Sequence, residues 1–334
     1  MPLPWLTVAL LASFAASALL TALARRYALG RQLLDQPGER RSHVVATPRG
    51  GGIAIVLSQL LALVGIGLAF PAMAGTLAVF AAGLSLVAGI GWWDDHKPLP
   101  ALPRLLVHVL AALLLGALVW YWTADAFKAV FTVLLAAGLV NVWNFMDGIN
   151  GLAASQAILV AVACALLLPA PLAPLPLLLA AAVAGFLPFN FPKARIFMGD
   201  VGSGALGYLV AGMVALGLVG AADIGWMTWL VPLAAFGIDA GLTLSVRILN
   251  GERWMQAHKQ HLYQRYVERG ASHAAVTGFY ALFTLLAVIL ALLLSRLSPV
   301  SQQCGALLWL LLSALLWMGL RKLNVRQGGN SNVA

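Results

Sequence analysis

Charged residues are scarce in this sequence of 334 residues. Only 9% of the chain is Asp, Glu, Lys or Arg, whereas ordinary soluble domains contain roughly 25%. Cysteine is almost absent, and the 2 cysteines have neither a CxxC partner nor a metal-ligand spacing, which excludes a disulfide scaffold. Apolar residues fill the chain instead, with 62% hydrophobic residues and a mean hydropathy of +0.92. These values exclude a soluble enzyme and a disordered chain, and they predict an integral membrane protein.

The apolar residues occur in long continuous runs. A helix that crosses the roughly 30 Å apolar core of a bilayer needs about 20 such residues. Membrane barrel strands are shorter and alternate in polarity, so the runs predict helices. We therefore predict an all-α, polytopic membrane protein with about 11 spans, near residues 3–23, 53–70, 72–91, 103–122, 126–143, 152–168, 175–190, 203–220, 226–247, 275–295 and 303–320.

The basic residues predict how the chain is oriented. The net charge is +9, but no basic stripe or recognition module stands apart from the apolar runs, so we expect no nucleic-acid partner. All but two of the 20 Lys and Arg residues, Lys128 and Arg296, fall in odd-numbered connections or the C-terminal tail. The positive-inside rule then predicts a periplasmic N-terminus and a cytoplasmic C-terminus. We expect one membrane domain, 1–334, with cytoplasmic active-site loops at 24–52, 91–104, 141–151, 190–204 and 247–274.

The segment GWWDDHKPLP places two adjacent carboxylates, Asp94 and Asp95, directly after an apolar run. Neighbouring carboxylates repel each other unless a cation lies between them. Hard divalent cations take oxygen ligands and usually share them with substrate phosphates. The pair therefore indicates either a Mg²⁺ or phosphate site or a solvated loop that ends a helix.

The segment NVWNFMDGINGLA carries Asn141, Asn144 and Asp147 at intervals of three residues. This spacing places the three side chains on one face of a helix. Polar groups beside lipid need partners, so the pattern indicates a water-filled cleft or hydrogen bonds between helices.

The segment FNFPKARIFMGDVGSGALG joins a basic loop, with Lys193 and Arg195, to Asp200 and a glycine-rich helix start. The glycines formally match GxGxxG. The dinucleotide fingerprint, however, also needs a preceding strand in a βαβ unit, and this chain has none. A carboxylate beside a helix N-terminus can instead hold a metal and offer backbone N–H groups to a phosphate.

Two further features lie near the C-terminal third of the chain. Asp239 lies inside an apolar run, where an ionisable residue indicates a functional site or a buried structural hydrogen bond. The segment AHKQHLYQRY carries His258 and His261, three residues apart, with Arg265 nearby. The histidines indicate stabilisation of a diphosphate or a solvated amphipathic loop, because no further Cys or His completes a zinc site.

Five motifs together resemble one family. DQPGERRSHVVATPRGGG, WWDDHKPL, NVWNFMDGINGLA, FNFPKARIFMGDVGS and AHKQHLYQRY occur in the order seen in the polyprenyl-phosphate N-acetylhexosamine-1-phosphate transferases, relatives of phospho-MurNAc-pentapeptide translocase. The resemblance covers nearly the whole chain. It implies transfer of a sugar-1-phosphate from a UDP-sugar to undecaprenyl phosphate, release of UMP and dependence on Mg²⁺, with Mn²⁺ as a substitute.

The resemblance also implies roles for individual residues. The residues expected to be catalytic are Asp94, Asp95, Asp147, His258 and His261. The expected metal ligands are Asp200, Asp94 and Asp95. The residues expected to bind substrate are Asn141, Asn144, Asn150, Lys193, Arg195, Arg49 and Arg265.

Two departures from the family pattern bear on the substrate. Many members have an aspartate where this chain has Asn150, and the translocase branch has three histidines where this chain has HKQH. The pattern is similar to the branch that initiates O-antigen or related surface polysaccharides. We expect direct displacement at the bacterial inner membrane, with UDP-N-acetylhexosamine, undecaprenyl phosphate and membrane lipid as partners, and we allow for a homodimer. The alternatives are phospho-MurNAc-pentapeptide transfer, a secondary transporter, or a lipid-binding scaffold without catalysis.

Overall fold

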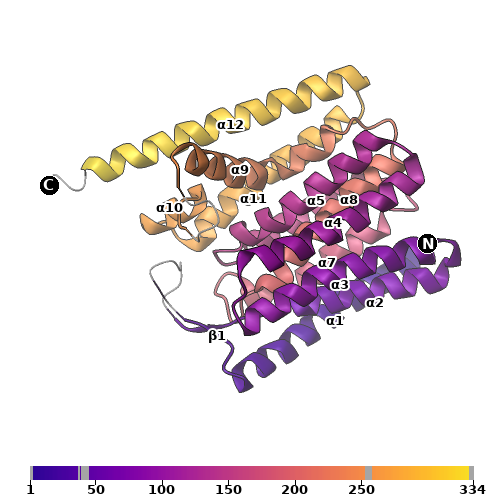
Figure 1. Cartoon of the computed structure of the whole chain (residues 1–334), viewed down its shortest axis with the longest axis horizontal. Coiled ribbons are helices and arrows are strands. Elements are labelled where there is room, and N and C mark those ends of the chain that lie inside the picture. Colours follow the sequence, from indigo (N-terminus) through magenta and orange to yellow (C-terminus); the bar gives the residue numbers. More distant parts are fainter. Residues whose placement is uncertain (1–2, 37, 39–44, 253–257, 331–334) are drawn as a thin grey trace.

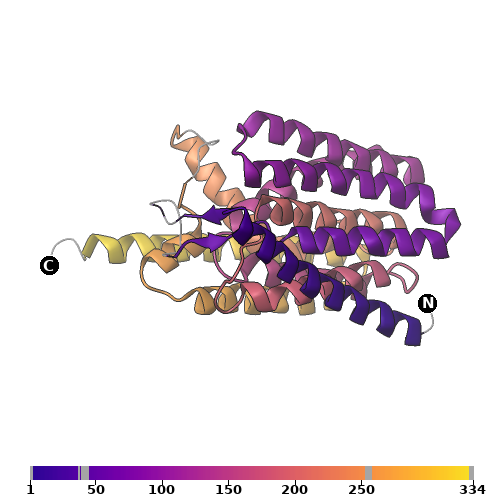
Figure 2. The ribbon, with the colours of Figure 1, turned by 90° about the horizontal axis from the view of Figure 1, so that it is seen from below.

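The computed structural model describes residues 3–36, 38, 45–252 and 258–330. Part of the first motif (37 and 39–44) and part of the predicted loop 247–274 (253–257) therefore lie outside the described residues. The described chain is almost entirely helical, and its helices run roughly along one axis (Figures 1 and 2). This arrangement confirms the predicted all-α, polytopic fold.

Each predicted apolar run forms a helix. The helices are α1 (Leu3–Gly30), α2 (Ile53–Ala69), α3 (Ala74–His96), α4 (Ala101–Thr123), α5 (Ala126–Met146), α6 (Leu152–Leu167), α7 (Pro174–Asn190), α8 (Asp200–Gly220), α9 (Ala234–Leu249), α11 (His273–Leu294) and α12 (Pro299–Asn330). Among the described residues, 8 helical segments are long and apolar enough to cross a membrane. The other three, α2, α6 and α7, have only 16 or 17 residues. At 1.5 Å per residue they reach about 25 Å, less than the apolar core of a bilayer.

Short elements connect these helices. Two 3-10 turns, η1 (Pro71–Met73) and η2 (Thr228–Leu233), precede α3 and α9. A short helix, α10 (Leu262–Glu268), lies between α9 and α11. Strands β1 (Leu34–Asp35) and β2 (Thr47–Pro48) pair antiparallel, with Leu34 opposite Pro48. Neither α10 nor the strand pair is predicted by hydropathy, because neither is an apolar run.

Helix α8 occupies the centre of the bundle. In its most apolar 18-residue stretch, 94% of the residues are buried, whereas in the corresponding stretches of α1 and α12 only 17% are buried. In Figure 1, α1 and α12 lie along opposite edges of the molecule. Small residues allow neighbouring helices to approach α8 closely. A side chain at Gly91 of α3 would collide with the Asp200 carbonyl, and one at Gly207 of α8 would collide with the Leu139 carbonyl of α5.

The polar motifs lie on helix ends rather than in loops. The predicted loops 91–104, 141–151 and 190–204 begin or end inside helices, since α3 continues to His96, α5 continues to Met146 and α8 begins at Asp200. The physical reason is that a helix satisfies its own backbone hydrogen bonds, so it continues past the last apolar side chain. Figure 1 shows β1, α10 and the C-terminus at one end of the bundle and the N-terminus at the other.

Candidate active site

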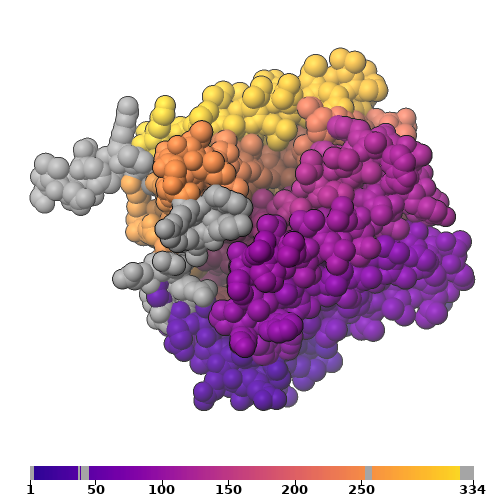
Figure 3. Space-filling view, in the orientation of Figure 1, coloured from indigo at the N-terminus to yellow at the C-terminus, as the bar shows by residue number. Residues whose placement is uncertain are grey.

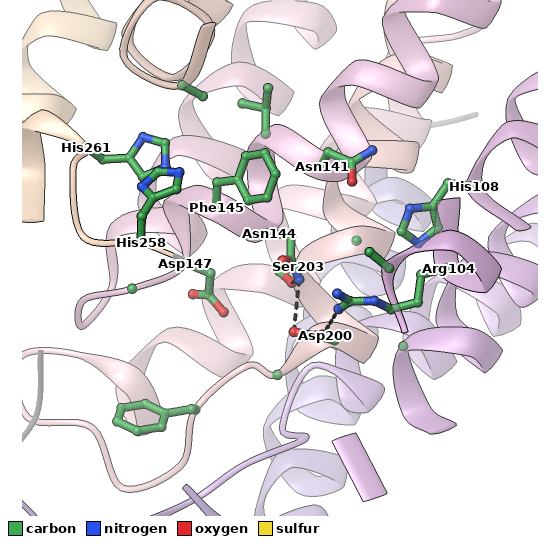
Figure 4. A pocket seen from close by; sticks show the side chains of 18 of the residues that line it. Arg104, His108, Asn141, Asn144, Phe145, Asp147, Asp200, Ser203, His258 and His261 are labelled. Carbon is green, nitrogen blue, oxygen red and sulfur yellow. Dashed lines mark hydrogen bonds and ion pairs between the residues drawn. The ribbon is translucent and has the colours of Figure 1, made fainter. Parts of the chain in front are cut away.

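A cavity of about 640 Å³ opens at the end of the bundle that carries β1 and α10. Helices α3, α4, α5, α8 and α9 contribute to its wall, together with residues around α10. Figure 3 shows the surface recessed between the orange and yellow C-terminal helices and the magenta helices α4 and α5. Polar side chains from segments that are far apart in the sequence meet in this cavity (Figure 4).

Asp200, the first residue of α8, is held from two sides. One nitrogen of the Arg104 guanidinium, Nη1, lies 3.0 Å from Asp200 Oδ2 and 2.7 Å from Asp94 Oδ2. The Asn144 amide donates hydrogen bonds to Asp200 Oδ1 at 2.9 Å and to Ser203 Oγ at 3.1 Å. Carboxylates from α3 and α8 therefore meet at a single positive charge, while α5 holds one of them from the side.

The carboxylate of Asp95 binds backbone N–H groups rather than Arg104, which is the partner of Asp94. Its two carboxylate oxygens accept hydrogen bonds from the backbone N–H groups of Asp200 and Val201, each at 3.1 Å. The first N–H groups of a helix have no partner inside the helix, and the helix dipole favours negative charge there. Arg49 in turn donates a hydrogen bond to the backbone carbonyl of Asp95. Asp95 thus joins the end of α3 to the start of α8 and fixes the backbone of Asp200.

Asp147 follows directly after α5 and faces the cavity (Figure 4). Its carboxylate accepts no hydrogen bond from the residues that the structure describes. Burial raises the pKa of Asp147 well above its usual value, and the negative charges of Asp200 and Asp95 raise it further. A cation or a proton is therefore the partner that this carboxylate needs.

The two histidines line the opposite wall. The ring centroids of His258 and His261 lie 4.9 Å apart, and His261 stacks against Phe145 and Tyr263. Burial, the neighbouring His261 and the charge of Arg247 lower the pKa of His258 to about 4. Burial likewise lowers the pKa of His261.

Asp239 is a buried structural centre. Its Oδ1 accepts hydrogen bonds from the backbone N–H of Leu262 and the indole of Trp317, both at 2.9 Å, and from the Thr243 hydroxyl at 3.3 Å. Its Oδ2 accepts one from the Tyr280 hydroxyl at 2.7 Å. The carboxylate therefore ties α9 to α10, α11 and α12, which confirms the structural alternative for this residue.

Comparison with known proteins identifies the family. A model of glycosyl transferase family 4 matches residues 77–218. A decaprenyl-phosphate N-acetylglucosaminephosphotransferase of Mycobacterium leprae is 30% identical over 81% of this chain and 78% of that protein. The chain belongs to glycosyl transferase family 4. This confirms the resemblance drawn from the five motifs, and it makes the protein a membrane transferase.

Other relatives in the family carry different names. A probable undecaprenyl-phosphate N-acetylglucosaminyl 1-phosphate transferase of Bacillus subtilis is 27% identical over 80% of this chain and 79% of that protein. A phospho-N-acetylmuramoyl-pentapeptide-transferase of Deinococcus radiodurans is 31% identical over 73% of this chain and 82% of that protein.

The structure brings most of the predicted site residues of this family 4 transferase together. The cavity wall includes Arg49, Asp95, Asn141, Asn144, Asp147, Asp200, His258 and His261. Asp94 contacts the wall through Arg104 without lining the cavity. The Asn141 amide donates its hydrogen bond back to the carbonyl of Ala137 in its own helix, at 2.8 Å.

Four residues predicted to bind substrate do not line the cavity. Asn150 donates a hydrogen bond to the Pro192 carbonyl at 3.0 Å, and Lys193 is exposed. The Arg195 guanidinium donates to the Pro188 carbonyl and lies over the Phe189 ring. Arg265 donates to the Gln260 carbonyl at 3.0 Å. The side chains of Asn150, Arg195 and Arg265 therefore hold the backbone around the cavity.

Several cavity residues are missing from the sequence-based set, and Arg104, His108 and Ser203 are among them. Arg104 and His108 are four residues apart in an apolar helix and so share one face. That spacing is the signal that could have found them. Ser203 lies one turn after Asp200 on α8, within the decoy GxGxxG pattern.

Proposed function

We propose that this protein transfers an N-acetylated hexosamine-1-phosphate from a UDP-sugar to undecaprenyl phosphate and releases UMP. The observation that carries the proposal is the meeting of Asp94, Asp200, Arg104 and Asn144 at one cavity, beside Asp147, whose carboxylate has no hydrogen-bond partner among the described residues. The relatives named above support the class of reaction. The basic loops at the same end of the bundle support a cytoplasmic opening, by the positive-inside rule.

The oxygen-rich donor set fits Mg²⁺, which prefers carboxylate and amide oxygens. Among the described residues, no three acidic, His or Cys side chains are grouped closely enough to hold a metal by themselves. Mg²⁺ usually takes only one or two carboxylates from the protein and the rest from water and phosphate. Asp200 and Asp94 would supply those carboxylates, and the bound cation would neutralise charge on the diphosphate. The oxygens of Asp95 are already occupied, which favours a structural role for that residue over the predicted metal ligand.

The remaining steps fall to side chains of the cavity. An oxygen of the lipid phosphate attacks the phosphorus that bears the sugar, and the bond from that phosphorus to the bridging oxygen of UMP breaks. Arg49 and Arg104 offset the repulsion between the two anionic substrates. The histidine pair lies where it can donate to a developing or leaving phosphate. We favour one direct displacement, and we propose a lipid-linked surface polysaccharide as the pathway.

The decisive assay follows radiolabelled UDP-sugars in detergent-purified protein supplied with undecaprenyl phosphate. We expect UMP release and a labelled lipid from a UDP-N-acetylhexosamine, abolished by EDTA and restored by Mg²⁺ or Mn²⁺. Asp200→Asn should lose about 3 kcal/mol of transition-state stabilisation, or roughly 100-fold in rate.

Asp223→Asn is the matched control, because Asp223 is an exposed carboxylate beyond the other end of α8. Full activity of Asp200→Asn in EDTA would refute the site. A labelled lipid formed only from UDP-MurNAc-pentapeptide would favour the peptidoglycan alternative, and substrate uptake without any lipid product would favour a transporter.

A further inference from the structure

A single guanidinium nitrogen bridges two carboxylates at the wall of the cavity, one from α3 and one from α8. Arg104 Nη1 lies 2.7 Å from Asp94 Oδ2 and 3.0 Å from Asp200 Oδ2. Figure 4 shows Arg104 reaching toward Asp200 from α4. The two carboxylates repel each other unless a positive charge, from a cation or a shared proton, lies between them. Arg104 supplies that charge in the structure.

The second oxygen of each carboxylate is held by a different partner. Asp94 Oδ1 accepts a hydrogen bond from the backbone N–H of Leu99, and Asp200 Oδ1 accepts one from Asn144 at 2.9 Å. Only the two Oδ2 atoms face Arg104. The carboxylates would therefore keep their positions if another cation replaced the guanidinium.

Arg104 itself is loosely held. Its hydrogen bonds and ion pairs with described residues run through Nη1 alone, and its side chain is 30% exposed. Arginine keeps its charge at every working pH, so it cannot leave by losing a proton. A cation that neutralised the two carboxylates in its place would release it.

The same face of α4 offers a second polar group. His108 lies one turn beyond Arg104, lines the cavity, and has a buried Nδ1 without a hydrogen-bond partner in the described residues. A guanidinium released from the carboxylates would share this face with His108. Both could then donate to a phosphate in the cavity.

We propose that Arg104 is an exchangeable counter-cation: it holds the metal position between Asp94 and Asp200 in the resting enzyme, leaves when a divalent cation binds, and then binds a substrate phosphate. The inference rests on the proposed function for the identity of the anion. The exchange between arginine and cation does not depend on catalysis. It can be measured without any substrate.

The first test measures Mn²⁺ affinity by electron paramagnetic resonance in purified protein without substrate. Arg104→Gln should bind Mn²⁺ about 10-fold more tightly than the wild type, because the competing charge is gone. Arg104→Lys keeps the charge and should stay near the wild-type affinity. Asp200→Asn should abolish binding, which shows that the measured site is the right one.

Arg49→Gln separates exchange from general electrostatics. Arg49 also lines the cavity, but it binds the backbone carbonyl of Asp95 and not the two Oδ2 atoms. Its removal should change Mn²⁺ affinity less than 3-fold, a modest long-range effect of one charge. An equal gain in Arg49→Gln and Arg104→Gln would overturn the proposal, and so would an unchanged or weaker affinity in Arg104→Gln.

The second test uses the wild type, so it does not depend on a variant that folds. Mg²⁺ should increase the modification of Arg104 by phenylglyoxal, measured by mass spectrometry, because binding frees the guanidinium. Unchanged or reduced modification would refute the exchange. Arg104→Gln should also weaken binding of UDP in saturating Mg²⁺ about 10-fold. If UMP release fails while the Mn²⁺ results hold, the proposed function is wrong and the exchange stands.

Discussion

Replacing Asp239 should destabilise the fold more than any single surface change. The side chain is only 1% exposed, and its carboxylate accepts four hydrogen bonds, three of them at 2.9 Å or less. Hydrogen bonds to charged groups contribute about 1.5–3 kcal/mol each, and the cost of burying the charge offsets part of that sum. Asp239→Leu leaves the donors buried without an acceptor. We expect a loss of about 4 kcal/mol in the free energy of unfolding.

Thermal unfolding in detergent, followed by circular dichroism, measures this loss. A loss of about 4 kcal/mol lowers the midpoint by roughly 8 °C or more. Asp239→Asn keeps an acceptor oxygen for Leu262 and Trp317 and should lose less than half as much. Asp223→Asn is the surface control and should unfold like the wild type. If Asp239→Leu unfolds within 2 °C of the wild type, by the same conversion, the carboxylate does not hold the four helices together.

Two further predictions concern charge. His258 has a folded-state pKa of about 4, below its unfolded value of about 6.5. The unfolded chain therefore takes up a proton first, and stability should fall as pH drops from 6.5 to 4. His258→Gln should flatten that part of the unfolding-midpoint profile, and an identical slope in both proteins would contradict the assignment. The second prediction concerns the orientation of the chain in the membrane. The basic connections lie at the same end of the bundle as the C-terminus, so a C-terminal reporter should be active only in the cytoplasm. Activity in the periplasm would reverse the topology.

Hydropathy was sufficient to locate the helices but not their ends. Each apolar run became a helix, because lipid exposure and backbone hydrogen bonding both favour that outcome. The extension of α3 through Asp94 and Asp95 could not be predicted, since it depends on the α8 backbone N–H groups that donate hydrogen bonds to the Asp95 carboxylate. The short helix α10 depends in the same way on Asp239, which binds its first N–H group.

The site residues likewise fall into those that the sequence revealed and those that it could not reveal. Residues whose chemistry is costly in a membrane, such as Asp147 and Asp200, stand out in the sequence and do line the cavity. Arg104 did not stand out among the other basic residues, because its role arises only when α3, α4 and α8 pack together. Lys193 has the right charge for a substrate residue, but its loop carries it away from the cavity.

The central place of α8 has a consequence for how the protein is made. The helices that pack around it, α2 to α6, all precede it in the chain. During translation, α8 is therefore synthesised after the helices that surround it. It can pack against them before α9 to α12 have been made. We expect the part of the site formed by Asp94, Asn144 and Asp200 to assemble during translation, before the histidine-bearing part has been synthesised.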